Sequence, residues 1–202
     1  MGLPLDQELI AGREAARSYL LGAADAFWVP SRVLYRASIV RASDPFFPGS
    51  ASSADLEACL NCLRQSDLGF VHQILSFERL HDEATTAQVA KMNSHLIERM
   101  RILVAVAPDF LSPDERDRRL DEQLSVYFAE LAAACFNFRN REFWRLHQQW
   151  LGELGYSMYN RRFAKAITAK IFDLTLHPTT TTQKVVRRIK SYRSVRIRNT
   201  AL

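Results

Sequence analysis

The sequence contains few of the residues that mark specialised protein classes. Its 202 residues include only three cysteines, seven glycines and seven prolines. The low, odd cysteine number argues against a disulfide scaffold and predicts a reducing, cytoplasmic environment. No uncharged apolar run approaches the roughly 20 residues of a membrane span, and Asp6 and Glu8 do not fit a signal peptide. With 48% apolar and 24% charged residues, the chain is expected to fold as a soluble globular protein.

Short catalytic motifs are also missing. The sequence has no glycine-rich phosphate loop and no G-x-S-x-G elbow. The Cys59-x-x-Cys62 pair has no second pair to complete a zinc site, and its apolar helical context favours two small core residues. His95 and His147 have no histidine partner four residues later, so we expect ordinary solvated or satisfied side chains.

Positive charge is concentrated at the C-terminus. The net charge is +5, but residues 174–202 carry seven Lys or Arg and no acid, which leaves −2 for residues 1–173. A basic segment at 184–198 is able to touch an anionic membrane surface, although most such tails are simply solvated. Tyr192 is its only aromatic residue, so we do not expect nucleic-acid binding.

Hydrophobic periodicity divides the chain near residue 84. Before that point, residues 9–21 predict a helix ended by Gly22, Ser53 is expected to cap a second helix, and the runs at 33–35 and 70–77 predict strands.

After Thr86 the period is helical throughout. Ser112-Pro113-Asp114-Glu115 predicts a helix start with a capping box, and further helices are expected at 141–151 and 156–174.

The predicted fold class is therefore α+β and mostly helical. We expect a region with a partial mixed sheet at 1–83, an all-α extension at 84–176, and a linker with the basic tail at 177–202.

A linked series of residues between Pro30 and His81 resembles a known family. In order and spacing, it is similar to the second half of the catalytic domain of bacterial family 2 glycosyltransferases, which have the GT-A fold. The similar region covers roughly residues 3–83. The matching segments are Pro30-Ser31-x-Val33-Leu34-Tyr35-Arg36, Phe46-Phe47, Asp55-Leu56-Glu57, Phe70-Val71-x-Gln73-x-Leu75-x-Phe77 and Arg79-x-His81.

The resemblance implies an inverting sugar transfer from a nucleotide sugar to a glycan or lipid-linked acceptor. A carboxylate must take the acceptor proton, and positive charge must stabilise the departing diphosphate. By resemblance, Asp55 is the base, Glu57 and Arg36 support the acceptor, and Arg79 and His81 lie near the diphosphate. His81 would bind Mg²⁺ or Mn²⁺ only together with an Asp-x-Asp motif.

Two departures from the family limit this hypothesis. Ala54 replaces the first acid of the usual Glu-Asp pair, and no Asp-x-Asp is present, so the nucleotide-binding half is missing. We expect this chain alone to be inactive, to need no metal, and to associate with itself or with a partner chain. The favourable effect of acids in a first helical turn would explain Asp55 and Glu57 without catalysis. The alternative function is a helical module that binds a protein or a membrane surface, cytoplasmic or peripheral at the inner membrane face.

Overall fold

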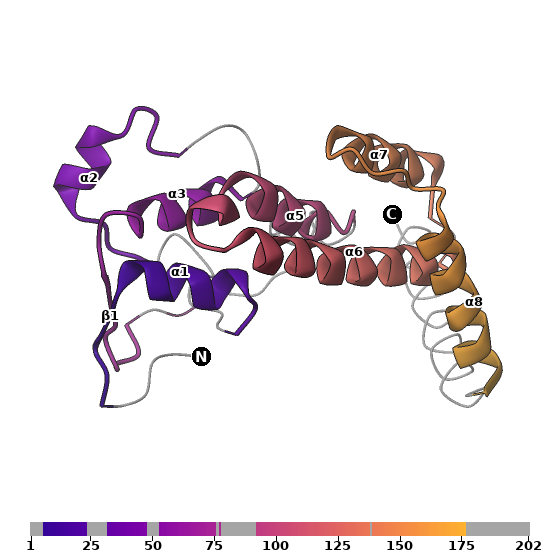
Figure 1. Cartoon of the computed structure of the whole chain (residues 1–202), viewed down its shortest axis with the longest axis horizontal. Coiled ribbons are helices and arrows are strands. Elements are labelled where there is room, and N and C mark those ends of the chain that lie inside the picture. The colour runs from indigo at the N-terminus through magenta and orange to yellow at the C-terminus, as the bar shows by residue number, and fades with distance from the viewer. Residues whose placement is uncertain are drawn as a thin grey trace, which may run out of the picture. The chain divides into compact units, whose positions relative to one another are not determined.

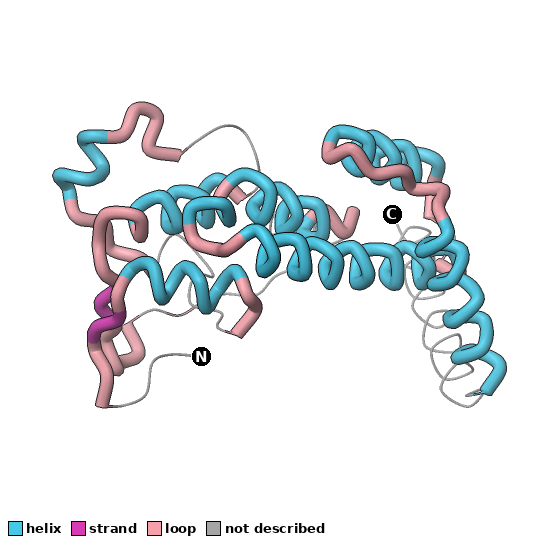
Figure 2. Tube along the Cα trace, viewed as in Figure 1, coloured by secondary structure: helices cyan, strands magenta, loops and turns pink. Residues whose placement is uncertain are grey.

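The computed structural model describes residues 6–23, 32–47, 53–75, 77, 92–137 and 139–176 (Figure 1). Helices dominate these ranges (Figure 2), and the two strands, β1 (Leu9–Ile10) and β2 (Leu68–Gly69), pair antiparallel. The predicted α+β, mostly helical class is confirmed. The helices are α1 (Gly12–Leu20), α2 (Ala37–Ala42), α3 (Ala54–Cys62), α5 (His95–Ala105), the 3₁₀ helix η2 (Ala107–Asp109), α6 (Pro113–Cys135), α7 (Arg141–Glu153) and α8 (Arg161–Leu176).

The chain forms two compact units, Met1–Tyr127 and Phe128–Leu202. The period change near residue 84 does coincide with a change in secondary structure, because both strands precede it and the described elements after it are helical. The core of the first unit nevertheless includes residues from both sides of that position. The linker and basic tail predicted at 177–202 lie outside the described residues.

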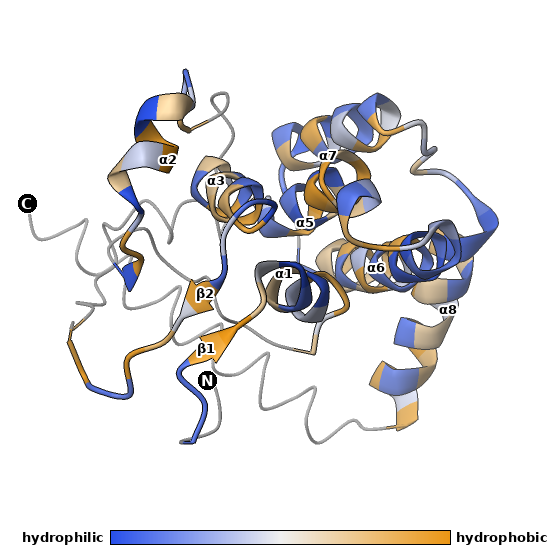
Figure 3. Ribbon diagram, turned by 60° about the vertical axis from the view of Figure 1, so that its left-hand side comes forward, coloured by the Kyte–Doolittle hydropathy of each residue, from blue (hydrophilic) through white to orange (hydrophobic). Residues whose placement is uncertain are grey.

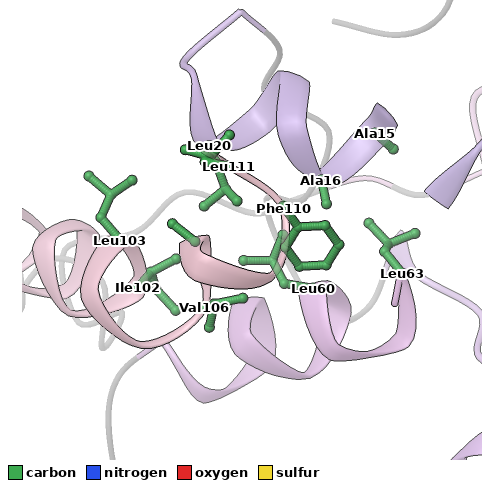
Figure 4. Packing of buried hydrophobic residues seen from close by; sticks show 11 residues of the cluster. Ala15, Ala16, Leu20, Leu60, Leu63, Ile102, Leu103, Val106, Phe110 and Leu111 are labelled. Atoms are coloured by element: carbon green, nitrogen blue, oxygen red, sulfur yellow. The ribbon is translucent and has the colours of Figure 1, made fainter. Parts of the chain in front are cut away.

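The core of the first unit joins four helical segments (Figure 4). The small residues Ala15 and Ala16 on α1 allow this helix to approach the others, while larger side chains from α3, from α5 and from the residues that flank η2 fill the space between them. Leu60 on α3 is fully buried. Close packing of this kind makes each large side chain costly to remove. The cluster consists of Ala15, Ala16, Leu20, Leu60, Leu63, Ile102, Leu103, Val106, Ala107, Phe110 and Leu111.

A glycine permits the closest approach within this unit. Gly12 begins α1, and a Cβ at this position would overlap the carbonyl oxygen of Ser66 and lie 2.6 Å from that of Leu63. The Gly12 amide donates a hydrogen bond of 3.0 Å to Asp67 Oδ1. The start of α1 is therefore held directly against the turn that follows α3.

The capping box predicted at the start of α6 is confirmed. The Glu115 amide donates to Ser112 Oγ at 3.3 Å, and the Ser112 amide donates to Glu115 Oε2 at 3.0 Å. These two bonds satisfy donors that the helix itself leaves unpaired. The same Glu115 carboxylate also accepts hydrogen bonds from both terminal nitrogens of Arg17, which lies on α1.

Acid is expected to weaken this contact. The Arg17 hydrogen bond and, after it, the Ser112 amide lower the pKa of Glu115 to about 2. Since the folded pKa lies below the ordinary value of 4.5, the stabilisation is complete above that value and is lost as the pH falls toward 2. We expect the difference in thermal midpoint between the native protein and Glu115→Gln to shrink between pH 6 and pH 2. Arg17→Met should reduce the same pH dependence; a difference that stays constant with pH would contradict the assignment.

The second unit contains the end of α6 together with α7 and α8. Asn140 and Asn160 cap the two later helices, with side-chain oxygens that accept from Phe143 N at 3.0 Å and Phe163 N at 2.9 Å. The ring centroids of Phe128 and Phe163 lie 5.9 Å apart. Helix α8 begins at Arg161 rather than at the predicted residue 156, because residues 158–160 form a bend that ends in the Asn160 cap.

Other sequence-based expectations differ from the structure. The strand predicted at 33–35 is irregular, and pairing in the second predicted strand stops at Gly69, before residues 70–77. β1 and β2 lie side by side (Figure 3), and in their antiparallel register the residues after Gly69 face Glu8 and the residues before it. The Phe70 amide still donates to the Glu8 carbonyl oxygen at 2.8 Å, but the Gln7 carbonyl oxygen lies 2.9 Å from the side-chain Nε2 of His72, and regular pairing does not continue among the described residues.

The start of α3 also differs in one bond. Ser53 precedes the helix as predicted, but its hydroxyl donates to Glu98 Oε2 at 2.7 Å instead of capping the helix.

Within the described ranges, no helix combines the length and the apolar character needed to cross a bilayer.

Candidate functional site

Asp55, the residue expected to act as a base, lies in the first turn of α3. Its side chain is half-buried, and Oδ1 accepts a 2.8 Å hydrogen bond from the amide of Leu56. No other described residue hydrogen-bonds to this carboxylate. One oxygen is therefore oriented by the backbone, and the other makes no hydrogen bond to a described residue.

Two more motif residues, Tyr35 and Phe46, lie together with Cys59 in the neighbourhood of Asp55. The hydroxyl of Tyr35 lies 2.9 Å from Cys59 Sγ, and the rings of Tyr35 and Phe46 meet edge to face at a centroid distance of 4.9 Å. Burial raises the pKa of both Tyr35 and Cys59, and the nearby Asp55 charge adds to the rise. Tyr35 and Cys59 therefore stay protonated at neutral pH, so Cys59 is not a thiolate nucleophile.

Both cysteines of the Cys59-x-x-Cys62 pair are buried on α3, with 6% and 8% of their surfaces exposed. Burial also raises the pKa of the Cys62 thiol. The prediction that they are small core residues is confirmed by this burial.

Arg36 lines an open cleft, here called the Arg36 cleft, between the segment before α2 and the end of α3. Its volume is about 210 Å³, which is smaller than the roughly 300–1,000 Å³ of drug-sized sites. Tyr35, Cys59 and Leu63 form part of its apolar wall, and Asp67 adds an acid. Arg36 itself is exposed at the N-terminal end of α2, and no described acid pairs with it. The cleft can accept one small polar group beside an apolar surface.

Of the remaining predicted site residues, the structure describes only Glu57. Glu57 is half-buried in the same helical turn as Asp55. Arg79 and His81 lie outside the described residues, so their expected place near a diphosphate stays a prediction. Across the described part of the chain, no group of three or more His, Cys, Asp or Glu side chains is positioned to hold a metal ion. The implied Mg²⁺ or Mn²⁺ therefore rests on the family resemblance alone.

A second cleft was not expected from the sequence. It lies among α1, α3, α5 and α6, has a volume of about 140 Å³, and is lined by both Arg99 and Arg119. Gln123 also lines it, although only 6% of this residue is exposed. The position of Gln123 could have been predicted from the helical spacing of residues in α6, since Gln123 falls on the same face of this helix as Leu120 and the buried Tyr127.

Comparison of this chain with known proteins found no related protein. No protein-family model, no curated protein and no solved structure matches this chain.

Proposed function

We propose that this chain is the acceptor-side portion of a family 2-like inverting glycosyltransferase, in which Asp55 takes the proton of the acceptor hydroxyl. The observation that carries the proposal is the Asp55 carboxylate, fixed on one oxygen by the Leu56 amide and open on the other. Its place at the start of α3, near the packed motif residues Tyr35 and Phe46, supports this role.

The Arg36 cleft supports the acceptor role. A guanidinium on its rim can donate to sugar hydroxyls, while the ring of Tyr35 offers the apolar surface on which a sugar ring packs. The nucleotide sugar and its Mg²⁺ or Mn²⁺ would be held by an Asp-x-Asp-containing half, a motif that this sequence does not contain. Arg79 and His81 would contact the diphosphate from this side.

An exposed apolar segment favours a second candidate, an interaction module without catalysis. After β2 the chain presents several large apolar side chains to solvent, with Ile74 82% and Phe77 92% exposed. Exposed apolar groups of this kind mark surfaces that bind another chain. The segment would contact either a nucleotide-binding half, a second copy of this chain or an unrelated partner. Its large exposed residues are Val71, Ile74, Leu75 and Phe77.

One experiment separates the two candidates. The nucleotide-binding half of a complete family 2 glycosyltransferase is joined to the N-terminus of this chain, and release of uridine diphosphate from nucleotide sugars is measured with Mn²⁺. We expect release by the chimera and none by the chain alone, because only the chimera contains the Asp-x-Asp motif. A chimera that binds the donor by calorimetry but releases no uridine diphosphate would overturn the glycosyltransferase proposal and leave the interaction module.

A further inference from the structure

The second cleft, here called the Arg99–Gln123 cleft, is lined by the side chain of the largely buried Gln123. Only 6% of Gln123 is exposed, yet its side-chain amide reaches solvent and makes no hydrogen bond to another described residue. An amide in this position is satisfied by solvent until a polar group of a ligand replaces the water. Because Gln123 lines the cleft, a molecule in the cleft is the natural partner for this amide.

Two guanidinium groups determine the charge that the cleft accepts. Arg119 is fixed by a 3.0 Å bond from Nε to the carbonyl of Leu20 and a 2.8 Å bond from Nη1 to Glu122. Arg99, from α5, has no ion pair with any described acid. One arginine is thus already positioned, and the other carries an uncompensated charge at the same cleft. This combination favours an anion with a planar, forked acceptor.

Part of the cleft lining is apolar. Leu20, Leu56, Ile102 and Leu103 line it together with the polar groups. A bare inorganic anion would leave these apolar side chains without contacts, whereas a short branched or cyclic hydrocarbon would cover them. The volume of about 140 Å³ limits the occupant to a small molecule or to the end of a chain.

We infer that this cleft binds a small carboxylate with a compact apolar body, through Arg99, Arg119 and the Gln123 amide. The carboxylate comes from a free acid or from the C-terminal residue of a peptide. The cleft shares no lining residue with the Arg36 cleft, so this binding does not depend on the proposed sugar transfer.

Ligand-observed saturation-transfer NMR on the full chain tests the inference. Isovalerate represents the free acid, N-acetylleucine the peptide end, and isovaleramide the same body without charge. For ligands of this size we expect a Kd on the order of 1 mM for an acid, and binding about tenfold weaker or more for the amide. Tighter binding of isovalerate assigns the site to free acids, and tighter binding of N-acetylleucine assigns it to peptide ends.

Variants distinguish this site from general surface binding. Arg99→Gln and Gln123→Met should each weaken the binding of the acid about tenfold, while Arg118→Gln, an exposed arginine of α6 outside the cleft, should leave it unchanged. The inference is overturned if neither acid binds, if isovaleramide binds equally well, if inorganic phosphate binds more tightly than both acids, or if Arg99→Gln has no effect.

Discussion

Replacing Asp55 with Asn in the chimera described above is expected to lower sugar transfer by about 10²–10⁴-fold, the usual contribution of a general base. The amide keeps the shape of the side chain and can still accept from the Leu56 amide, so α3 should retain its start. Only the proton acceptor is lost. Calorimetry should therefore show nearly unchanged donor binding beside the fall in turnover, measured as transfer to the acceptor.

Two further variants serve as controls for the effect of Asp55→Asn. Glu14→Gln removes an exposed carboxylate of α1 and should leave transfer unchanged. Glu57→Gln tests the other acid in the same turn of α3. If Glu57→Gln abolishes transfer and Asp55→Asn does not, the two carboxylates have been assigned the wrong roles.

Gly12→Ala is expected to lower the free energy of unfolding by about 3 kcal/mol. The added methyl group would meet the backbone oxygens of Ser66 and Leu63, which cannot rotate away as a side chain would. Overpacking of this kind costs about 1–3 kcal/mol. Displacement also breaks the bond to Asp67, worth about 1.5–3 kcal/mol for a charged acceptor. The higher helix propensity of alanine stabilises the folded state by about 1 kcal/mol and so offsets part of this loss.

Urea unfolding followed by far-ultraviolet circular dichroism measures this change. Gly69→Ala is the control in the same unit, because a Cβ there would only reach ordinary contact with the carbonyl oxygen of Glu8 at 4.0 Å. We expect Gly69→Ala to change the free energy of unfolding by less than about 1 kcal/mol. Equal effects of the two substitutions would show that the close approach at Gly12 is not what makes the residue necessary.

The helices that the sequence predicts correctly are those whose ends are determined locally. Ser112 and Glu115 lie three residues apart and form their capping box without help from the rest of the chain. Gly22 ends the first helix because it adopts a positive φ of 78°, which other residues rarely do. Such features depend on neighbours in sequence, so the sequence is sufficient to predict them.

The predicted strands failed because pairing depends on distant residues. The alternation of residues 70–77 suits a half-buried strand, but a strand also needs a partner of similar length. The partner is β1, and in its register residues 70–77 would have to pair with Glu8 and earlier residues, where regular pairing does not continue among the described residues. Nothing within residues 70–77 reveals that limit, and Ile74 and Phe77 are left exposed.

Only part of the candidate site could be predicted from the sequence, because the rest of it also depends on contacts between distant residues. The position of Asp55 in the first turn of α3 follows from Ser53 and the leucine spacing after it, so the sequence predicted it. The meeting of Arg99 and Gln123 at one cleft depends on how α5 and α6 pack, which no local pattern describes.

The contact between Arg17 and Glu115 also has a consequence for protein synthesis, because the two residues are 98 positions apart. At a translation rate of about 5–20 residues per second, roughly 5–20 s pass between their appearance on the ribosome. During this delay α1 has neither its ion-pair partner nor Phe110 and Leu111 of the shared core. The apolar side of the nascent first helix therefore has only the α3 part of the core to pack against at first, and it is fully covered only after Leu111 has been made.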